Sequence, residues 1–259
     1  MRFVPSKQWL LGLICVFTAL AYALVIVIGM RLPVFPGRED TSSHFGSREL
    51  VEQGRQIFEF TPIYASSYAR ANLSCSSCHA EGGLQPTAAP MTGVEARFPH
   101  FSSRAGRVIS LRDRVRECFI RSENGSPPDD KSETMHAMLA YLHSISKRPA
   151  VEPVTTGGLP ILPILRGDAN AGQQLYISHC VGCHGDHGEG VAPQWPPLWG
   201  QESFNNGAGM DQVPKLASFI RYNMPQNNRG SLSSQQAYDL AAYITKQPRP
   251  QLDQQLATF

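Results

Sequence analysis

Two copies of the pattern Cys-x-x-Cys-His constrain this chain more than any other feature of its sequence. They span residues 75–79 and 180–184, and the pattern is typical of covalent attachment of c-type haem, with the histidine as the proximal iron ligand. A redox pair of cysteines or half of a zinc site is the alternative, but zinc would need the two pairs to converge, and both copies end in histidine. The sequence therefore predicts two covalently bound haem c groups. Their attachment residues are Cys75, Cys78 and His79 in the first copy and Cys180, Cys183 and His184 in the second.

The N-terminal segment has the composition of a membrane anchor. Residues 9–30 are 22 residues without a charge, about the length that crosses a ~30 Å hydrocarbon core as a helix. Arg2 and Lys7 precede this segment, which predicts that the N-terminus stays in the cytoplasm. A signal peptide cleaved near residues 21–23 is the alternative, but the apolar run is longer than the ~7–15 residues of such a peptide. We therefore expect a single-pass anchor over residues 1–30, with the haem domains on the periplasmic side of the inner membrane.

Length and charge set further limits. The 259 residues suit one to two domains beyond an anchor. A net charge of +2 is too small to indicate a nucleic-acid partner.

An internal duplication organises the rest of the chain. Residues 54–58 (GRQIF) match 172–176 (GQQLY), and residues 139–142 (LAYL) match 241–244 (AAYI). The apolar residues of both halves recur at helical spacing. The predicted fold is therefore all-α, with two tandem class I cytochrome c domains behind one N-terminal transmembrane helix. The first half carries an insertion near residues 61–73, because its glycine precedes the haem motif by 21 residues and the second only by 8.

Changes in residue composition along the chain predict the boundaries of its domains. Pro, Gly and Ser are enriched in residues 31–46, and Pro and Gly in residues 148–166, which predicts two linkers. The second linker is expected to hold the domains apart without forming a helix. The predicted parts are an anchor (1–30), a linker (31–46), a first haem domain (47–147), a linker (148–166), a second haem domain (167–250) and a tail (251–259).

The sixth iron ligand separates electron carriers from catalysts. In the second domain, Met224 is the candidate, because it precedes a proline in a loop and follows His184 by 40 residues. Met210, in a glycine-rich turn, is the rival, and burial of Met224 in the core is the other alternative.

The same spacing in the first domain leads to Cys118, which follows His79 by 39 residues. Cys118 is thus the predicted counterpart of Met224, and a thiolate on the iron would lower the haem potential relative to a methionine. Four other residues lie at poorer spacing: Met91, His100, Met135 and His136. An inert buried cysteine is the remaining alternative.

Arginines are concentrated around Cys118. Residues 104–121 hold six arginines and two acids, and cationic surroundings stabilise a thiolate. Arg107, Arg114 and Arg121 recur every seven residues, and Arg114 lies one helical turn from Cys118. Convergence of Arg104 and Arg114 on the thiol would suit a small dianion; a solvated charged face is the alternative.

These residues resemble a known family, the bacterial dihaem thiosulfate dehydrogenases. The resemblance lies in the runs 72–75 (NLSC), 104–107 (RAGR), 118–125 (CFIRSENG) and 203–210 (SFNNGAGM), together with Arg114. It covers about residues 47–250. The haem cytochromes of sulfur-oxidising complexes that join thiosulfate to a carrier protein are a related resemblance.

The resemblance implies oxidation of two thiosulfates to tetrathionate at a first haem ligated by His79 and Cys118, with electrons leaving through a second haem ligated by His184 and Met224. The implied catalytic residues are Cys118, Arg104, Arg114, Arg121 and Ser122. The implied electron acceptor is a cytochrome c or a membrane oxidase. Two departures stand out: many relatives lack an anchor, and Asn223 stands where the family can have a lysine that competes as ligand.

Two other functions fit the same sequence. One is a non-catalytic, membrane-anchored dihaem electron carrier to a terminal oxidase, in which Cys118 is only a low-potential ligand. The other is the same site working in reverse, as a tetrathionate reductase.

Overall fold

The computed structural model describes residues 47–148, 155–156, 158–191 and 193–256. The predicted anchor and the first linker lie outside these residues. Within the described ranges, no helix has both the length and the apolar content needed to cross a membrane.

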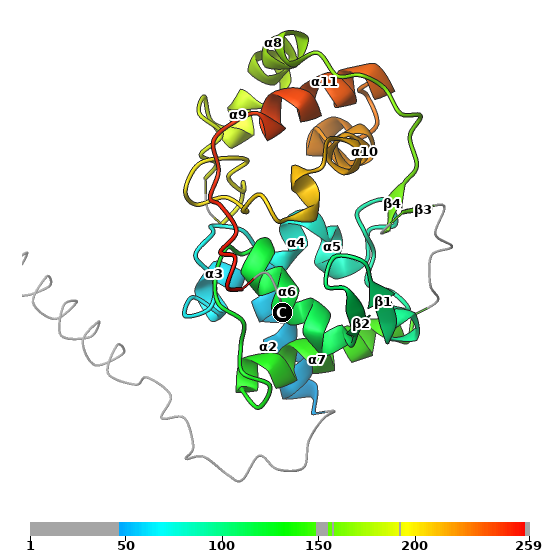
Figure 1. Cartoon of the computed structure of the whole chain (residues 1–259), viewed down its shortest axis with the longest axis vertical. Helices are drawn as coiled ribbons and strands as arrows, with labels where there is room; N and C mark the ends of the chain where they lie inside the picture. The colour runs from blue at the N-terminus through cyan, green and yellow to red at the C-terminus, as the bar shows by residue number, and fades with distance from the viewer. Residues whose placement is uncertain (1–46, 149–154, 157, 192, 257–259) are drawn as a thin grey trace, which may run out of the picture. The chain divides into compact units, whose positions relative to one another are not determined.

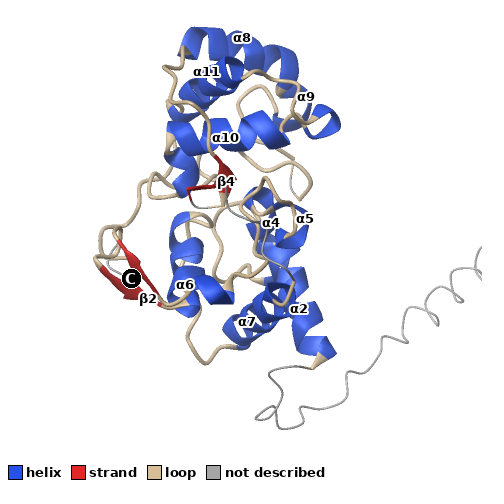
Figure 2. Ribbon diagram, turned by 90° about the vertical axis from the view of Figure 1, so that its right-hand side faces the viewer, coloured by secondary structure: helices blue, strands red, loops and turns tan. Residues whose placement is uncertain are grey.

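Two long helices build the core of the first domain (Figures 1 and 2). They are α2 (Arg48–Glu59) and α7 (Glu133–Ser146), which pack against each other. At their crossing, a Cβ on Gly54 would lie 2.0 Å from the carbonyl oxygen of Ala137, so only glycine permits this approach. A third helix, α6 (Leu111–Arg121), packs on the same core through Val115 and Phe119.

The second domain repeats this crossing. Helix α8 (Ala169–His179) packs against α11 (Ser234–Thr245), which also contacts α10 (Val213–Asn223). A Cβ on Gly172 would lie 2.0 Å from the carbonyl oxygen of Asp239, as at Gly54 in the first domain. The duplicated glycines predicted from sequence are therefore equivalent helix contacts.

Short elements connect these helices. The helical ones are α3 (Thr61–Tyr64), α4 (Cys75–Cys78), α5 (Ala80–Gly83), η1 (Glu95–Arg97), α9 (Val181–His184), η2 (Gly209–Asp211) and η3 (Gln226–Asn228). The antiparallel strand pairs are β1 (His100–Ser102) with β2 (Arg107–Ile109) and β3 (Thr155–Thr156) with β4 (Leu159–Pro160). The described fold is thus mostly helical, with two small strand pairs that the all-α prediction omits.

The second linker does not hold the domains apart, so that expectation is wrong. Leu159 is buried in a cluster with Ala88, Ala89 and Phe219, and Ser218 donates a hydrogen bond to the carbonyl of Pro160 at 2.5 Å. Burial of Leu159 favours this packing over an exposed spacer.

The insertion before the first haem motif also packs between the domains. Ala71 and Leu73 are buried with Phe204 and Ala208 of the second domain. The backbone N–H of Ala71 donates to the carbonyl of Glu123 at 2.9 Å. The insertion thus fills space at the domain interface.

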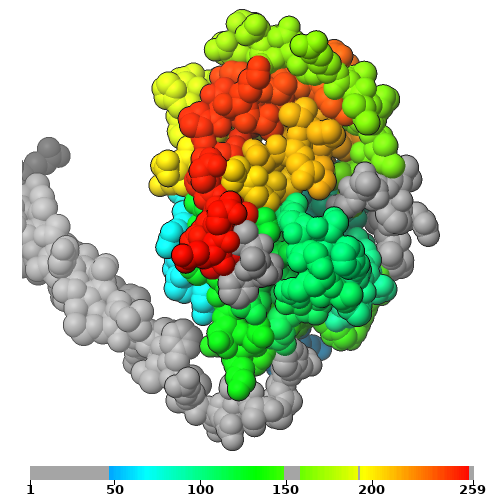
Figure 3. All heavy atoms as spheres, viewed as in Figure 1, coloured from blue at the N-terminus to red at the C-terminus, as the bar shows by residue number. Residues whose placement is uncertain are grey.

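The C-terminal segment returns to this interface. The backbone N–H of Leu252 donates to Asn206 Oδ1 at 2.8 Å, and Asn206 Nδ2 donates to Gln251 Oε1 at 2.7 Å. The segment lies on the face of the molecule shown in Figure 3, where it is drawn in red.

We expect Gly54→Ala to lower the free energy of unfolding by about 1–3 kcal/mol, because the new methyl group forces α2 away from α7. Gly209→Ala is the matched control, since its nearest atom would be 3.9 Å away. Chemical denaturation of the haem-loaded protein measures both values, and equal stability of the two variants would contradict the crossing described here.

Candidate active site

A cavity of about 450 Å³ is lined mainly by residues of the first domain. One part of its lining is Cys75, Cys78 and His79, and another includes Arg114, Cys118 and Ser122. The structure therefore brings together the first attachment motif and three of the predicted catalytic residues. Most of the remaining lining is apolar. Two attachment thiols, an imidazole and a further thiol around an apolar cavity fit a c-type haem.

The insertion helps to position the first attachment motif. Thr61 is fully buried and its hydroxyl donates to the carbonyl of Ile57 at 2.7 Å. The backbone N–H of Cys75 donates to the same hydroxyl oxygen at 3.2 Å. The start of α4 is thereby fixed to the end of α2.

Both predicted proximal histidines have the same hydrogen-bonded tautomer. His79 donates through Nδ1 to the carbonyl of Ala89 at 2.7 Å, and His184 donates through Nδ1 to that of Pro196 at 2.9 Å. Burial lowers the pKa of His79 to about 4 and also lowers the pKa of His184. Each ring is therefore neutral at pH 7, and its Nε2 lone pair is available to a metal.

Helix α6 carries Cys118 and Arg114. Its first turn is capped by Ser110 and Asp113, whose side chains each accept a hydrogen bond from the other's backbone N–H. Burial raises the pKa of Cys118, while Arg114 and Arg104 oppose that effect. The expected stabilisation of a thiolate by arginine is present, but burial outweighs it.

Arg104 lies close to two other arginines of this stretch, Arg114 and Arg121. Burial lowers the pKa of Arg104, and Arg114 and Arg121 lower it further. Arg114 donates to Glu117 at 2.7 Å, and this carboxylate is only 1% exposed. Arg114, close to Arg104 and Cys118, is thus paired with a buried acid.

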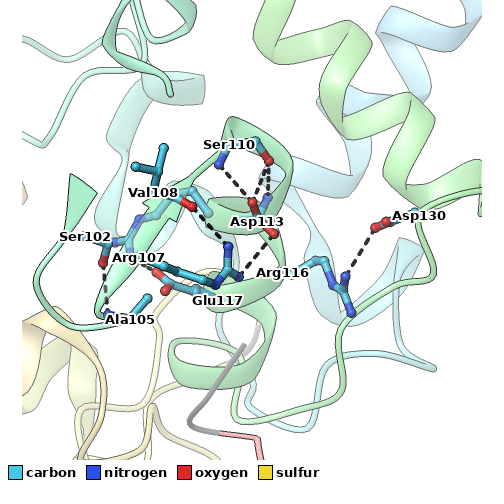
Figure 4. Close-up of polar contacts among 10 residues, drawn as sticks. Ser102, Ala105, Arg107, Val108, Ser110, Asp113, Arg116, Glu117 and Asp130 are labelled. Carbon is cyan, nitrogen blue, oxygen red and sulfur yellow. Dashed lines mark hydrogen bonds and ion pairs between the residues drawn. The ribbon is translucent and has the colours of Figure 1, made fainter. Parts of the chain in front are cut away.

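The other arginines of this stretch do not join the site. Arg107 pairs with Asp113 and Arg116 pairs with Asp130, each at 3.4 Å (Figure 4). Arg112 donates to the carbonyl of Asp130 at 2.6 Å. The seven-residue spacing that grouped Arg107 with Arg114 and Arg121 is misleading, because Arg107 lies in β2 and not in the helix.

The second domain completes the cavity, which sequence reasoning missed. Phe204, Ala208 and Met210 line it, and Arg104 donates to the carbonyl of Gly207 at 3.2 Å. Residues 203–210 were part of the sequence resemblance, but no periodicity indicated where they would lie.

Contacts with the end of α6 fix this segment. Asn205 Nδ2 donates to the carbonyl of Ile120 at 2.8 Å, and the backbone N–H of Asn205 donates to that of Arg121 at 3.1 Å. Arg121 is only 6% exposed beneath this contact.

Two further ionisable residues near the cavity were also missed. Lys215 of α10 has a pKa lowered by burial and by Arg104 and Arg114, which places a fourth cation near the arginines. Glu123 is 2% exposed and lines the cavity, and burial raises its pKa well above the usual range. Neither residue stood out by spacing.

The alternative ligands separate by position. Met91 and His100 line the cavity, whereas Met135 is fully buried in the first core and His136 lies outside the cavity lining. Met210, the rival of Met224, lines the cavity of the first domain. Met224 follows the last residue of α10 and packs against the core of the second domain.

Comparison with known proteins gives the family. The model of the SoxA/TsdA cytochrome c domain matches residues 61–151, and that of the cbb3-type cytochrome c oxidase subunit III matches residues 167–244. Thiosulfate dehydrogenase of Stutzerimonas stutzeri is 38% identical over 210 residues, which cover 78% of this chain and 68% of that protein. Thiosulfate dehydrogenase of Allochromatium vinosum is 38% identical over 213 residues, which cover 78% of this chain and 79% of that protein. The chain belongs to the thiosulfate dehydrogenase family.

A solved thiosulfate dehydrogenase agrees with this assignment. TsdBA from Marichromatium purpuratum superposes with a TM-score of 0.71 at 30% identity, over 83% of this chain and 49% of that one. This family member therefore spans about half the length of the solved chain. The two cytochrome c domains of the chain described here each carry one attachment motif. Its cofactors are therefore two covalently bound haem c groups.

We expect Glu123→Gln to change how stability depends on pH. An unfolded glutamate ionises above about pH 4.3, whereas Glu123 stays neutral in the fold until its raised pKa is reached. The free energy of unfolding of the wild type should therefore fall as pH rises from about 4.3 towards the raised pKa of Glu123, because only the unfolded chain loses this proton in that range, and the glutamine variant should lose less. Denaturation at several pH values measures this. The control is Glu202→Gln, at an exposed position; equal pH profiles for all three proteins would contradict the burial effect.

Proposed function

We propose that this protein oxidises two thiosulfate ions to one tetrathionate ion at the first haem and passes the electrons through the second haem to an external acceptor. Family membership and the two cytochrome c domains support thiosulfate oxidation with transfer of electrons to cytochrome haem. The observation that carries the finer proposal is the placement of Cys118, Arg114 and the first attachment motif around one cavity, with Arg104 beside it.

The residues proposed to hold the haem irons are His79 with Cys118 in the first domain and His184 with Met224 in the second. The Nδ1 hydrogen bonds of both histidines support this assignment, because they leave Nε2 for the iron. Cys118 lines the same cavity as His79. When bound, the haems supply the two one-electron acceptors that the reaction needs.

The arginines offset the main physical difficulty of the reaction, which is the repulsion between two thiosulfate dianions. Two thiosulfate dianions ~4 Å apart repel each other by about 4 kcal/mol in water, and by more at a lower effective dielectric. Arg104, Arg114 and Arg121 place three positive charges close to one another, and the buried Glu117 pairs with Arg114. Their guanidinium groups bind oxyanions through charge-assisted hydrogen bonds.

Cys118 gives the first thiosulfate a fixed partner. Its thiolate forms an S–S bond with the terminal sulfur of thiosulfate, and this step releases two electrons. A second thiosulfate then attacks the sulfur bonded to Cys118. Tetrathionate leaves, and the Cys118 thiolate is regenerated without further loss of electrons. Because the first ion is held covalently, the second thiosulfate reacts with a partner that is already in position, which raises the rate. The proposed role of Ser122, which lines the cavity, is to orient the bound ion through its hydroxyl.

The location and partners belong to the same proposal. The uncharged segment 9–30 is proposed to anchor the protein to the inner membrane, with both haem domains in the periplasm. The acceptor is proposed to be a cytochrome c or a membrane oxidase close to that membrane.

The deciding experiment adds thiosulfate to the oxidised, haem-loaded protein and follows haem absorbance. We expect reduction of the haems with formation of tetrathionate, and loss of both in Cys118→Gly. Haems that dithionite reduces but thiosulfate does not would support an electron carrier. Tetrathionate consumption without thiosulfate oxidation would support the reductase.

We expect Arg104→Gln to lower kcat/KM for thiosulfate by about 10- to 100-fold, the range that corresponds to one lost hydrogen bond to a charged group. Arg107→Gln is the matched control, because Arg107 pairs with Asp113 and not with the cavity; it should change the rate less than about twofold. Steady-state kinetics at several ionic strengths measure both variants, and equal effects would refute the anion site.

A further inference from the structure

Asn223 makes a buried contact across the domain interface. It is the last residue of α10, is 2% exposed, and immediately precedes Met224. Its Nδ2 donates to the carbonyls of Thr87 at 3.0 Å and Phe219 at 3.0 Å. Its Oδ1 accepts a hydrogen bond from the Thr87 hydroxyl at 2.8 Å. Both amide hydrogens and the carbonyl oxygen are thus used in holding one residue of the other domain and one of its own helix.

The partner loop is the one that holds the first proximal histidine. Thr87 lies two residues before Ala89, whose carbonyl accepts the Nδ1 hydrogen bond of His79. Ala88 and Ala89 are buried in one cluster with Phe219, and Met224 packs against this cluster. The loop 87–89 therefore contacts the ligand segments of both domains.

We infer that Asn223 is a positioning residue that fixes the Met224 segment to the loop 87–89, so that ligation of the second haem depends on contact with the first domain. This inference rests on the proposed role of Met224 as a ligand. It adds a cross-domain control on that ligand, which the proposed catalytic scheme does not contain.

The geometry favours an amide at this position over other residues. A carboxylate would place negative charge against two carbonyl oxygens, and an apolar residue would leave the Thr87 hydroxyl and both carbonyls without their partner. A long cationic side chain could not make the same three bonds within this buried space. Because the Asn223 side chain is held by these bonds, Met224 is the residue of this segment that is left to reach the metal.

The test uses the haem-loaded protein and the far-red absorbance band of ferric haem with a methionine ligand. This band reports the second haem alone if the first carries a cysteine ligand. Imidazole is the probe, because it competes with the methionine and removes the band. Two variants loosen the contact from opposite sides: Asn223→Ala in the second domain and Thr87→Val in the first.

We expect both variants to bind imidazole at the second haem more tightly than the wild type, by about fivefold or more, the factor that corresponds to loss of one ordinary hydrogen bond. Glu202→Ala is the control, because it removes a different cross-domain contact, the exposed 2.8 Å hydrogen bond from Asn72. This control should bind imidazole as the wild type does.

Thr87→Val is the sharper variant, since it changes a residue of the other domain and nearly preserves side-chain shape. An unchanged imidazole affinity in both variants overturns the inference, and so does an equal increase in Glu202→Ala. Absence of the band from the wild type overturns the ligand assignment together with the inference. A wild-type band with unaltered variants overturns only the inference.

Discussion

Electrostatic repulsion among Arg104, Arg114 and Arg121 is the constraint around which the domain interface is built. Arg121 is buried, Arg114 is half-buried and Arg104 is exposed. Guanidinium groups this close together are unfavourable unless acceptors surround them. The first domain supplies the carboxylate of Glu117 to Arg114, and the second domain supplies the carbonyl of Gly207 to Arg104. The proposed anion-binding surface therefore depends on contacts from both domains.

This dependence distinguishes the molecule from two electron carriers joined by a linker. The insertion 61–73, the segment 203–210 and the second half of the linker all lie at the interface. Each contributes to the lining of the cavity that holds Cys118: Leu73 comes from the insertion, Gly158 from the linker and Phe204 from the segment 203–210.

Sequence reasoning succeeded where a local rule fixes the structure. The attachment motifs, the duplicated glycines 54 and 172, and the helix that carries Arg114 and Cys118 each follow from short-range spacing. The placement of Cys118 in the cavity opposite the attachment motif follows from comparing the two halves, because duplicated folds preserve the position of equivalent residues.

Sequence reasoning failed where contacts between distant segments determine the structure. The residues 203–210 have no periodicity, and their position depends on backbone carbonyls at the end of α6. The prediction that grouped Arg107 with Arg114 and Arg121 assumed one continuous helix. Ser110 caps the helix, and Arg107 lies in the preceding strand. The sequence around Leu159 predicts an exposed, Pro-rich spacer, whereas the structure buries Leu159 against Ala89 and Phe219.

The shared wall of the cavity has a consequence for how this protein can be dissected. A first domain produced by itself would lack Phe204, Ala208 and Met210, and water would reach the part of the cavity that they line. Haem reduction potentials depend on burial and solvent access. The potential of the isolated half would therefore not be that of the same haem in the intact chain, and the two single-haem fragments would not sum to the whole enzyme.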